Sequence, residues 1–353
     1  MEAGSLRGAP DQAHTCWRAE TLPEDAVVVD RPRVATRAPT RRDTELLAGL
    51  SVASWEQDVR ALAAVRTRLS SGAGFMTAAT SAAATLEALG FTVRTDPVQV
   101  PGGVSATVVA DRVGSRTGAR RVVLITAHLD SINIAGGPTA VAPGADDNAS
   151  GAAGILELGR VLVGVTWQHD LRLLLFGGEE QGLFGSRQYV AALPLAERSR
   201  IRAVLNLDMI GRRNGPSRGV LLEGGPASAH LVDDLAAAAT SVTGLQVSTS
   251  LSPFASDHVP FLEAGIPAVL AIEDSDSSNH DIHSDRDVVA HIEPGLALEI
   301  LRMCLATLLR WLDSRPRPRP AGPVVARAPG RLDVFVVGSD SAMHHQVLKG
   351  PAG

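Results

Sequence analysis

Apolar runs of strand length, separated by segments with helical spacing, constrain the fold of this chain most. The longest runs cover residues 106–110, 122–126, 171–176, 203–207 and 268–272. Helical segments such as 151–163 and 294–312 lie between or after them. Strands that are apolar throughout are buried on both faces, which is typical of a largely parallel sheet covered by helices. The sequence therefore predicts an α/β fold, a three-layer α/β/α sandwich with a mostly parallel, mixed central sheet.

Weaker signals add elements to this prediction. Short apolar runs at 91–93 and 220–222 predict two more strands. Ser54, followed three residues later by Gln57, is typical of a helix start. Residues 78–89, which end at a glycine, predict a second helix in the N-terminal part.

Five stretches rich in acidic residues and histidine lie between residues 126 and 287. In chain order they read TAHLDS, GADDNASG, GGEEQGLFGS, LNLDMIG and HSDRD. Four of them follow an apolar strand, and GADDNASG comes just before a helix. Because the carboxyl ends of parallel strands meet at one edge of a sheet, we expect these side chains to gather there. Carboxylates and imidazoles in one place predict a metal centre.

The residue types favour zinc, which imidazole and carboxylate bind well. Two zinc ions carry four positive charges, which three carboxylates and a bridging hydroxide would neutralise. The carboxylates expected in this role are Asp147, Glu180 and Asp208. His128 and His283 would then complete one ion each, with one carboxylate shared between the ions. This arrangement is typical of a two-metal hydrolase, whose ions lie about 3.5–4 Å apart.

Neighbouring residues supply further roles. In the pair Glu179-Glu180, one carboxylate can bind metal while the other accepts a proton from water. Asp130, two residues after His128, is a natural acceptor for the ligand imidazole. Asp146 is interpreted as a helix cap and left out of the site. His280 could compete with His283 as a metal ligand. The spacing between His283 and the following acid, Asp287, favours His283.

These motifs, in this order, resemble the co-catalytic di-zinc aminopeptidases of the bacterial leucyl aminopeptidase type over residues 50–313. The resemblance implies a zinc-exopeptidase-like fold, two zinc ions and a fixed set of ligands. The implied ligands are His128, Asp147 as the bridge, Glu180, Asp208 and His283. Glu179 is the implied general base, Asp130 supports His128, and the peptide bond after Asp147 is expected to be cis. The chain has Pro253 and Phe254 where some relatives have a tyrosine.

The resemblance predicts an aminopeptidase that removes residues from the free N-terminus of peptides, through a water that bridges the zinc ions. It also implies a tendency toward hydrophobic substrate side chains. Two other interpretations stay open: a related zinc carboxypeptidase or deacylase, and a glutaminyl-cyclase-like transferase that uses one zinc ion. Measuring how many metal ions the protein binds would separate these interpretations.

Four segments are expected along the chain. Residues 1–42, which lack any period, predict a poorly ordered leader, and residues 43–313 form the peptidase domain. Residues 314–329 are a Pro/Arg-rich linker. Residues 330–353 resemble one incomplete repeat of a seven-bladed β-propeller lectin, or are disordered. A non-catalytic carbohydrate-binding protein is thus the interpretation from a different class, and glycan contact is expected only if this tail belongs to a longer protein.

Composition excludes several other classes. A net charge of −5 and 3% aromatic residues argue against nucleic acid as a partner. No run approaches the roughly 18 apolar residues of a membrane span. Cys16 and Cys304 lie outside the motifs, which argues against a thiolate metal site or a disulfide framework. We expect a monomer. The family resemblance favours secretion although no signal segment follows Met1, and the cytoplasm is the alternative.

Overall fold

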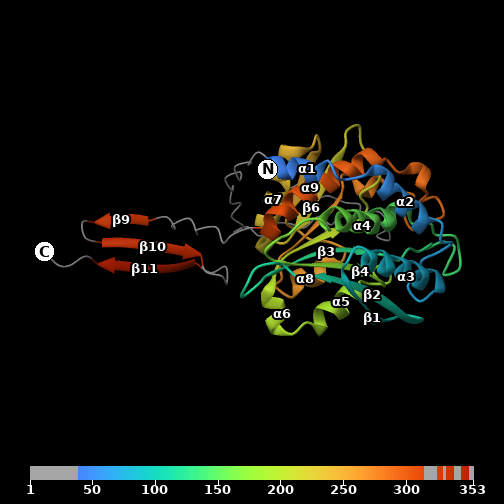
Figure 1. Cartoon of the computed structure of the whole chain (residues 1–353), viewed down its shortest axis with the longest axis horizontal. Helices are drawn as coiled ribbons and strands as arrows, with labels where there is room; N and C mark the ends of the chain where they lie inside the picture. Colours follow the sequence, from blue (N-terminus) through green and yellow to red (C-terminus); the bar gives the residue numbers. More distant parts are fainter. Residues whose placement is uncertain (1–38, 314–323, 329–330, 338–342, 350–353) are drawn as a thin grey trace, which may run out of the picture. The chain divides into compact units, whose positions relative to one another are not determined.

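The computed structural model describes residues 39–313, 324–328, 331–337 and 343–349. The chain divides into two compact units, Met1–Leu312 and Asp313–Gly353 (Figure 1). All five motifs lie in the first unit. Among the described residues, no helix combines the length and apolar character needed to cross a membrane.

The first unit is built on one mixed sheet. Its strands are β1 (Thr92–Val100), β2 (Gly103–Arg112), β3 (Val122–His128), β4 (Asp170–Phe176), β5 (Ile201–Leu207), β6 (Gly219–Gly224), β7 (Gln246–Ser250) and β8 (Ala268–Glu273). Their order across the sheet is β1-β2-β4-β3-β5-β8-β6-β7. The central strands β4, β3, β5 and β8 run parallel, whereas β2 and β6 run antiparallel to their inner neighbours. The predicted mostly parallel, mixed sheet is confirmed.

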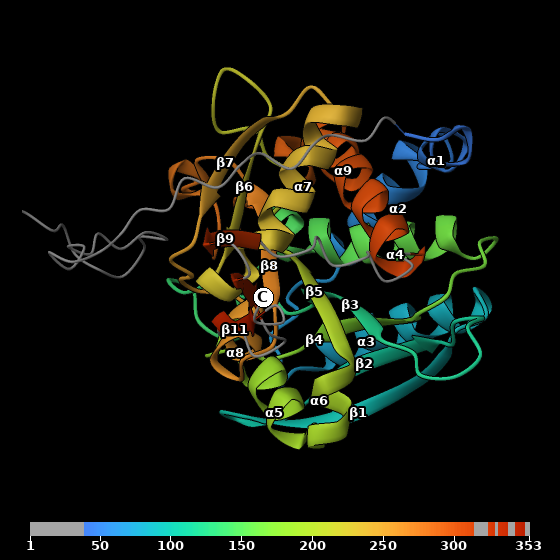
Figure 2. The same ribbon diagram turned by 90° about the vertical axis from the view of Figure 1, so that its left-hand side faces the viewer.

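Helices cover both faces of this sheet. They are α1 (Arg41–Leu47), α2 (Val52–Ala63), α3 (Ala73–Ala88), α4 (Gly151–Leu162), α5 (Phe184–Ala192), α6 (Leu195–Arg200), α7 (Ala229–Val242), α8 (His258–Glu263) and α9 (Pro294–Asp313). Residues of α2, α3, α4, α7 and α9 share one hydrophobic core with the sheet, and α5 and α8 pack in a second core on the opposite face (Figure 2). The three-layer prediction is therefore confirmed.

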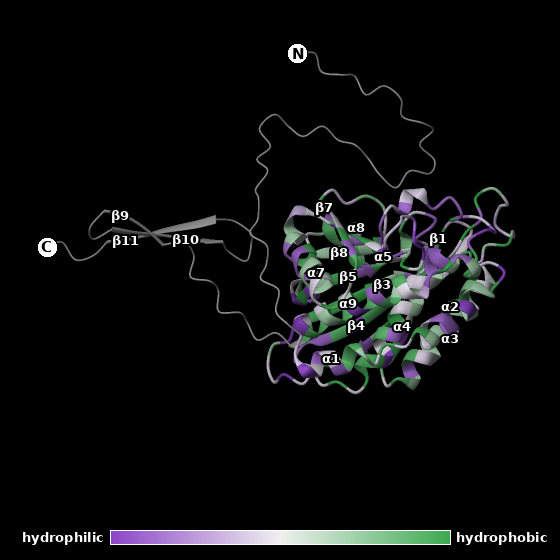
Figure 3. Ribbon diagram, turned by 90° about the horizontal axis from the view of Figure 1, so that it is seen from above, coloured by the Kyte–Doolittle hydropathy of each residue, from purple (hydrophilic) through white to green (hydrophobic). Residues whose placement is uncertain are grey.

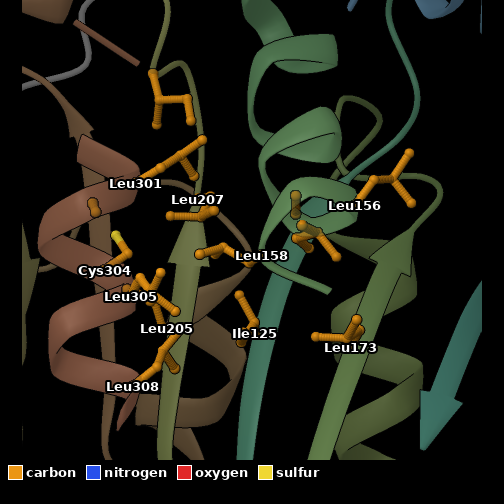
Figure 4. Close-up of a cluster of buried hydrophobic side chains, with 14 of the residues drawn as sticks. Ile125, Leu156, Leu158, Leu173, Leu205, Leu207, Leu301, Cys304, Leu305 and Leu308 are labelled. Carbon is orange, nitrogen blue, oxygen red and sulfur yellow. The ribbon is translucent and has the colours of Figure 1, made fainter. Parts of the chain in front are cut away.

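Apolar side chains fill the space between the sheet and its helices. Hydrophobic residues concentrate along the central strands, as Figure 3 shows. In the larger core, Leu158 of α4 and Leu305 of α9 pack with Leu205 of β5 (Figure 4). Cys304 is buried in the same core. It packs there as an apolar side chain.

Several local predictions need correction. Ser51, not Ser54, caps α2, because its hydroxyl accepts the N–H of Ser54. The helix predicted from residue 78 already begins at Ala73, and Phe75 in its first turn is buried on the same face as Ala78, Ala79 and Ala82. The predicted leader 1–42 overlaps α1, where Thr40 and Asp43 form a capping box. Residues 1–38 of that leader lie outside the described residues.

The second unit contains a three-stranded antiparallel sheet. Its strands are β9 (Val324–Ala328), β10 (Arg331–Val337) and β11 (Met343–Lys349), with β10 in the middle. Strand β9 lies within the predicted linker 314–329, where the Pro/Arg pattern gives way to β-favouring Val-Val. Residues 314–323 of that linker lie outside the described residues. The propeller-repeat interpretation stays a prediction.

Candidate metal centre

The sheet brings all five motifs to one edge. His128 ends β3, the Glu179-Glu180 pair follows β4, and Asp208 follows β5. His283 lies in the loop after β8, and Asp147 lies in the kinked turn Ala145–Ser150 that leads into α4. This is the edge formed by the carboxyl ends of the central parallel strands, where α/β proteins place their ligands.

Asp147 lies between the two histidines. Its Oδ1 is 3.1 Å from Nε2 of His128, and its Oδ2 is 3.0 Å from Nε2 of His283. The peptide bond Asp147–Asn148 is cis. One carboxylate therefore presents one oxygen to each imidazole, which is the geometry required of a bridging ligand.

Each histidine meets a second carboxylate. Nε2 of His128 lies 3.2 Å from Oδ1 of Asp208, and Nε2 of His283 lies 3.0 Å from Oε2 of Glu180. Ligand atoms at the corners of a tetrahedron, each 2.0–2.1 Å from zinc, are about 3.3 Å apart. The contacts thus define two histidine–carboxylate sets that share Asp147, one with His128 and Asp208 and one with His283 and Glu180. Their nitrogen–oxygen distances are close to those between the ligands of one zinc ion.

A polar atom without a partner supports this fit. Oε1 of Glu180 is buried and has no hydrogen bond among the described residues. Buried carboxylate oxygens are normally paired, and a cation would satisfy this one. The donor set, which holds imidazole nitrogens and carboxylate oxygens, suits zinc.

Glu179 lies beside these two sets, and with His128 and Asp208 it forms a group that could also hold a metal ion. Its Oε2 is 4.0 Å from Nε2 of His128, and its side chain is 13% exposed toward the cavity. Burial raises the pKa of Glu179 well above its usual value, and the nearby charge of Asp208 acts in the same direction although His128 opposes it. A carboxylate whose pKa is raised holds a proton more tightly, as a group that exchanges protons with water must.

Asp130 supports both the histidine and the glutamate pair. Its Oδ1 lies 3.5 Å from Nδ1 of His128, beyond the usual length of a hydrogen bond. Its carboxylate also accepts the N–H groups of Glu179 and Glu180, at 3.4 and 3.3 Å. The hydroxyl of Ser70 donates to Oδ2 at 2.8 Å. Asp130 therefore fixes the backbone of the glutamate pair and lies next to the imidazole of His128.

The site's electrostatics follow from crowded carboxylates. Burial raises the pKa of Glu180 to about 7, helped by the charge of Asp147. Burial opposes protonation of His283, yet Glu180 and Asp147 outweigh it and raise the pKa to about 12. The pKa of His128 is likewise raised, because Asp208 and Glu179 outweigh burial. Metal binding would displace these protons.

A chain of buried polar side chains reaches the site through the sheet, and the sequence motifs did not reveal it. Thr126 donates to Oδ1 of Asn206 at 2.6 Å, and Nδ2 of Asn206 donates to Ser256 at 2.8 Å. The Ser256 hydroxyl in turn donates to Oδ2 of Asp208 at 2.6 Å. A buried polar residue in the middle of the apolar strand β5 was the available signal.

The turn that carries Asp147 is fixed by two more acids. The carboxylate of Asp287 accepts the backbone N–H groups of Asp146 and Asp147, both at 2.9 Å. The side chain of Asp146 accepts from the N–H of Gly211 and from Asn279, also at 2.9 Å. The helix-cap interpretation of Asp146 is therefore wrong, because its carboxylate joins the turn to neighbouring loops.

Arg68, which no motif indicated, is fully buried beneath this turn. Its guanidinium donates to four backbone carbonyl oxygens from three separate segments of the chain. The acceptors are those of Leu62, Leu129, Pro143 and Gly144. Burial lowers the pKa of Arg68 to about 10, although Asp287 opposes this. His280, by contrast, is exposed and belongs to neither ligand set.

A cavity of about 300 Å³ opens beside the metal centre. Both ligand sets and Glu179 line one side of it. Its apolar lining consists of Leu183, Met209, Leu221, Phe254, Ala255, Leu270, Ile272 and Ile282. A cavity of this size admits a small ligand or one amino-acid side chain.

Comparison with known proteins agrees with this geometry. Residues 107–308, more than half of the chain, match the family model of Peptidase family M28. The chain is 33% identical to the aminopeptidase YwaD of Bacillus subtilis over 175 residues, which are 48% of this chain and 37% of that relative. The chain therefore spans under two fifths of that relative's length.

Solved structures share the fold. The zinc aminopeptidase BSAP from Bacillus subtilis superposes with a TM-score of 0.67 at 17% identity, over 76% of this chain and 97% of BSAP. The glutaminyl cyclase of Porphyromonas gingivalis gives a TM-score of 0.62 at 20% identity, over 73% of this chain and 98% of the cyclase. The match to the family model covers strands β3 to β8, most of β2, all five motifs, helices α4 to α8 and most of α9. This chain is a member of Peptidase family M28.

Proposed function

We propose that this protein is a zinc-dependent aminopeptidase that removes residues from the free N-terminus of peptides. The observation that carries the proposal is the pair of histidine–carboxylate sets joined by Asp147, with Glu179 beside them. Membership in a peptidase family, a relative named as an aminopeptidase and a zinc aminopeptidase of the same fold support it.

Two zinc ions are the proposed complement. His128, Asp147 and Asp208 would hold one ion, and His283, Asp147 and Glu180 the other. Zinc, when bound, polarises the scissile carbonyl, stabilises the charge that develops on its oxygen and lowers the pKa of water. Three carboxylates leave two zinc ions with one surplus positive charge, which an anionic nucleophile or substrate group would balance.

Glu179 is the proposed general base. Its carboxylate would accept a proton from the attacking water and return it to the amine that leaves. Asp130 would keep His128 in one orientation and hold the backbone of the glutamate pair. The cavity beside the centre would receive the side chain of the substrate's first residue.

A glutaminyl-cyclase-like transferase is the second candidate, favoured by the likeness to the Porphyromonas gingivalis enzyme. The two ligand sets favour the aminopeptidase, because a glutaminyl-cyclase-like transferase would use a single zinc ion. A carboxypeptidase or deacylase would share the two-metal site and differ in the end of the substrate that it recognises. We keep the monomeric and secreted state as proposals that rest on the family resemblance.

One substrate panel tests these alternatives. Purified protein is given amides of free amino acids, the same amides with an acetylated amine, and N-terminal glutaminyl peptides, each with and without a chelator. We expect hydrolysis of the free amides only, complete loss with the chelator, and two zinc ions per chain by elemental analysis. Turnover of the acetylated amides, or cyclisation with one zinc ion, would overturn the proposal.

A further inference from the structure

The cavity beside the metal centre has an apolar wall made by two adjacent strands. Leu221 of β6 pairs with Ile272 of β8, and Glu223 of β6 pairs with Leu270 of β8. Because side chains alternate along a strand, Leu221 and Glu223 face the same side. All four residues line the cavity, so its apolar wall includes one carboxylate.

Glu223 lies farther from the metal edge than Leu221 does. Strand β8 ends at the metal edge, and β6 runs antiparallel to it. The register places Glu223 beside Leu270, two residues below Ile272 on β8. The carboxylate therefore belongs to the inner part of the cavity, beyond an apolar stretch of wall.

The carboxylate of Glu223 is held in place by one hydrogen bond and borders the cavity. Its Oε1 accepts the backbone N–H of Phe254 at 2.8 Å and lies 3.3 Å from Nε2 of His258. The side chain of Glu223 is 10% exposed and lines the cavity. Asp276 lines the same cavity, so a second carboxylate outside the metal centre adds to the negative charge.

This composition suits one kind of substrate side chain. A leucine side chain in the cavity would remove water from Glu223 and offer no hydrogen bond in return, which is costly for a carboxylate. Lysine and arginine instead lay their methylene groups along apolar surface while the cationic end reaches a charged partner. A charge-assisted hydrogen bond to Glu223 would then replace the lost water.

We propose that Glu223 selects substrates whose N-terminal residue has a cationic side chain. This inference rests on the proposed aminopeptidase function and departs from the hydrophobic preference that the family resemblance implied. Glu223 acts as a specificity-determining residue, and the apolar wall of Leu221, Leu270 and Ile272 accepts the stem of the substrate side chain.

The experiment compares lysine amide with norleucine amide, which has a similar methylene stem without the ammonium group. For the zinc-loaded protein we expect kcat/KM to be about tenfold or more higher for lysine amide. The Glu223→Gln variant keeps an oxygen for the N–H of Phe254 but loses the charge. It should lose this preference and hydrolyse norleucine amide at least as well as the unchanged protein.

Two controls make the outcome specific. Glu263→Gln removes an equal charge from an exposed position on α8 and should leave the substrate ratio unchanged. Binding of the two amides to zinc-loaded Glu179→Gln protein, measured by calorimetry, reports selectivity without turnover. Equal kcat/KM for both amides, or a preference that survives Glu223→Gln, would overturn the inference while leaving the aminopeptidase intact. Absence of turnover with every free amide would overturn the proposed function itself and this inference with it.

Discussion

Ser256 donates a 2.6 Å hydrogen bond to Oδ2 of Asp208, while Oδ1 of the same carboxylate lies 3.2 Å from Nε2 of His128. The hydroxyl thus fixes the oxygen that faces away from the candidate metal and leaves the other oxygen free to bind. Ser256 is itself held by Asn206, and Asn206 by Thr126. The orientation of one ligand is in this way set by three buried residues on three different segments.

Replacing Ser256 with alanine should therefore weaken metal binding selectively. Without the hydroxyl, Oδ2 of Asp208 has lost its donor and the amide of Asn206 its acceptor. Loss of such an outer partner lowers metal affinity by about 10–100-fold. We expect this loss for the ion at His128 and not for the ion at His283, so a zinc titration against a competing chelator should separate into two steps.

Ser228→Ala is the matched control for this variant. Ser228 is equally buried and accepts the N–H of Ala268, at the end of β8 away from the metal centre. It should lose about 1 kcal/mol of stability, as expected for one hydrogen bond, and keep both zinc affinities. Unchanged zinc binding in Ser256→Ala would show that the hydrogen-bond chain does not contribute to metal affinity.

The Glu179→Gln substitution separates catalysis from metal binding. Glutamine keeps the size of the side chain and loses the ability to accept a proton from water. Because general-base catalysis contributes about 10²–10⁴-fold, kcat should fall by that factor while zinc content stays the same. Activity within a few-fold of the unchanged protein would show that another group accepts the proton, and loss of zinc would show that Glu179 is a ligand.

The sequence was sufficient to predict the candidate ligands that the structure brings together, because each lies in a short motif. His128, Asp147 and Asp208 could be placed without knowing which loops meet. Asp130 was also predicted, as the partner of His128, but the hydrogen-bond chain from Thr126 to Ser256 could not be predicted in this way. Asn206 lies inside an apolar strand. Its role as a hydrogen-bond donor depends on Ser256, which is fifty residues later in the sequence and lies beside it only in the folded protein.

The same distinction applies to the fold: elements set by their own residue pattern could be predicted, and elements that depend on distant partners could not. The buried strands β3, β4, β5 and β8 carry continuous apolar runs and were predicted. Strand β7, Gln246–Ser250, is polar and was not, because its place in the sheet depends on pairing with β6. Arg68 looks like a surface residue in the sequence. Four carbonyl oxygens from distant loops make its burial favourable.

Arg68→Lys should accordingly destabilise the protein although the charge is kept. An ammonium group cannot reach all four carbonyl oxygens in the way a guanidinium does. Each buried acceptor left without a donor costs about 1–3 kcal/mol, so we expect a total loss of about 2–5 kcal/mol. Urea unfolding measures this loss. Arg60→Lys, at an exposed position on α2, is the control and should change stability little. Equal stability of the two variants would contradict the structural role of Arg68.

Asp58 predicts a pH dependence of stability that is separate from the metal centre. Burial raises its pKa from 3.8 to about 6, and the charge of Glu157 adds to the shift. The folded state therefore binds the proton of Asp58 more tightly than the unfolded state does. The contribution of Asp58 to the free energy of unfolding is thus most favourable below pH 4 and becomes less favourable as the pH rises toward 6. Asp58→Asn removes this loss. Above pH 6 the variant should be more stable than the unchanged protein by about 1 kcal/mol, a value discounted for solvent screening. Near pH 4 the two should be equal.

Thermal unfolding of the metal-free proteins at pH 4 to 8 checks this difference. Comparing the two proteins at each pH cancels the contributions of the carboxylates at the metal centre, because both proteins contain them. Glu87→Gln, which removes an exposed carboxylate from α3, should give no pH-dependent difference. If Asp58→Asn shifts the unfolding midpoint equally at pH 4 and pH 8, the effect comes from the amide itself. Burial of the charge beside Glu157 would then not be its cause.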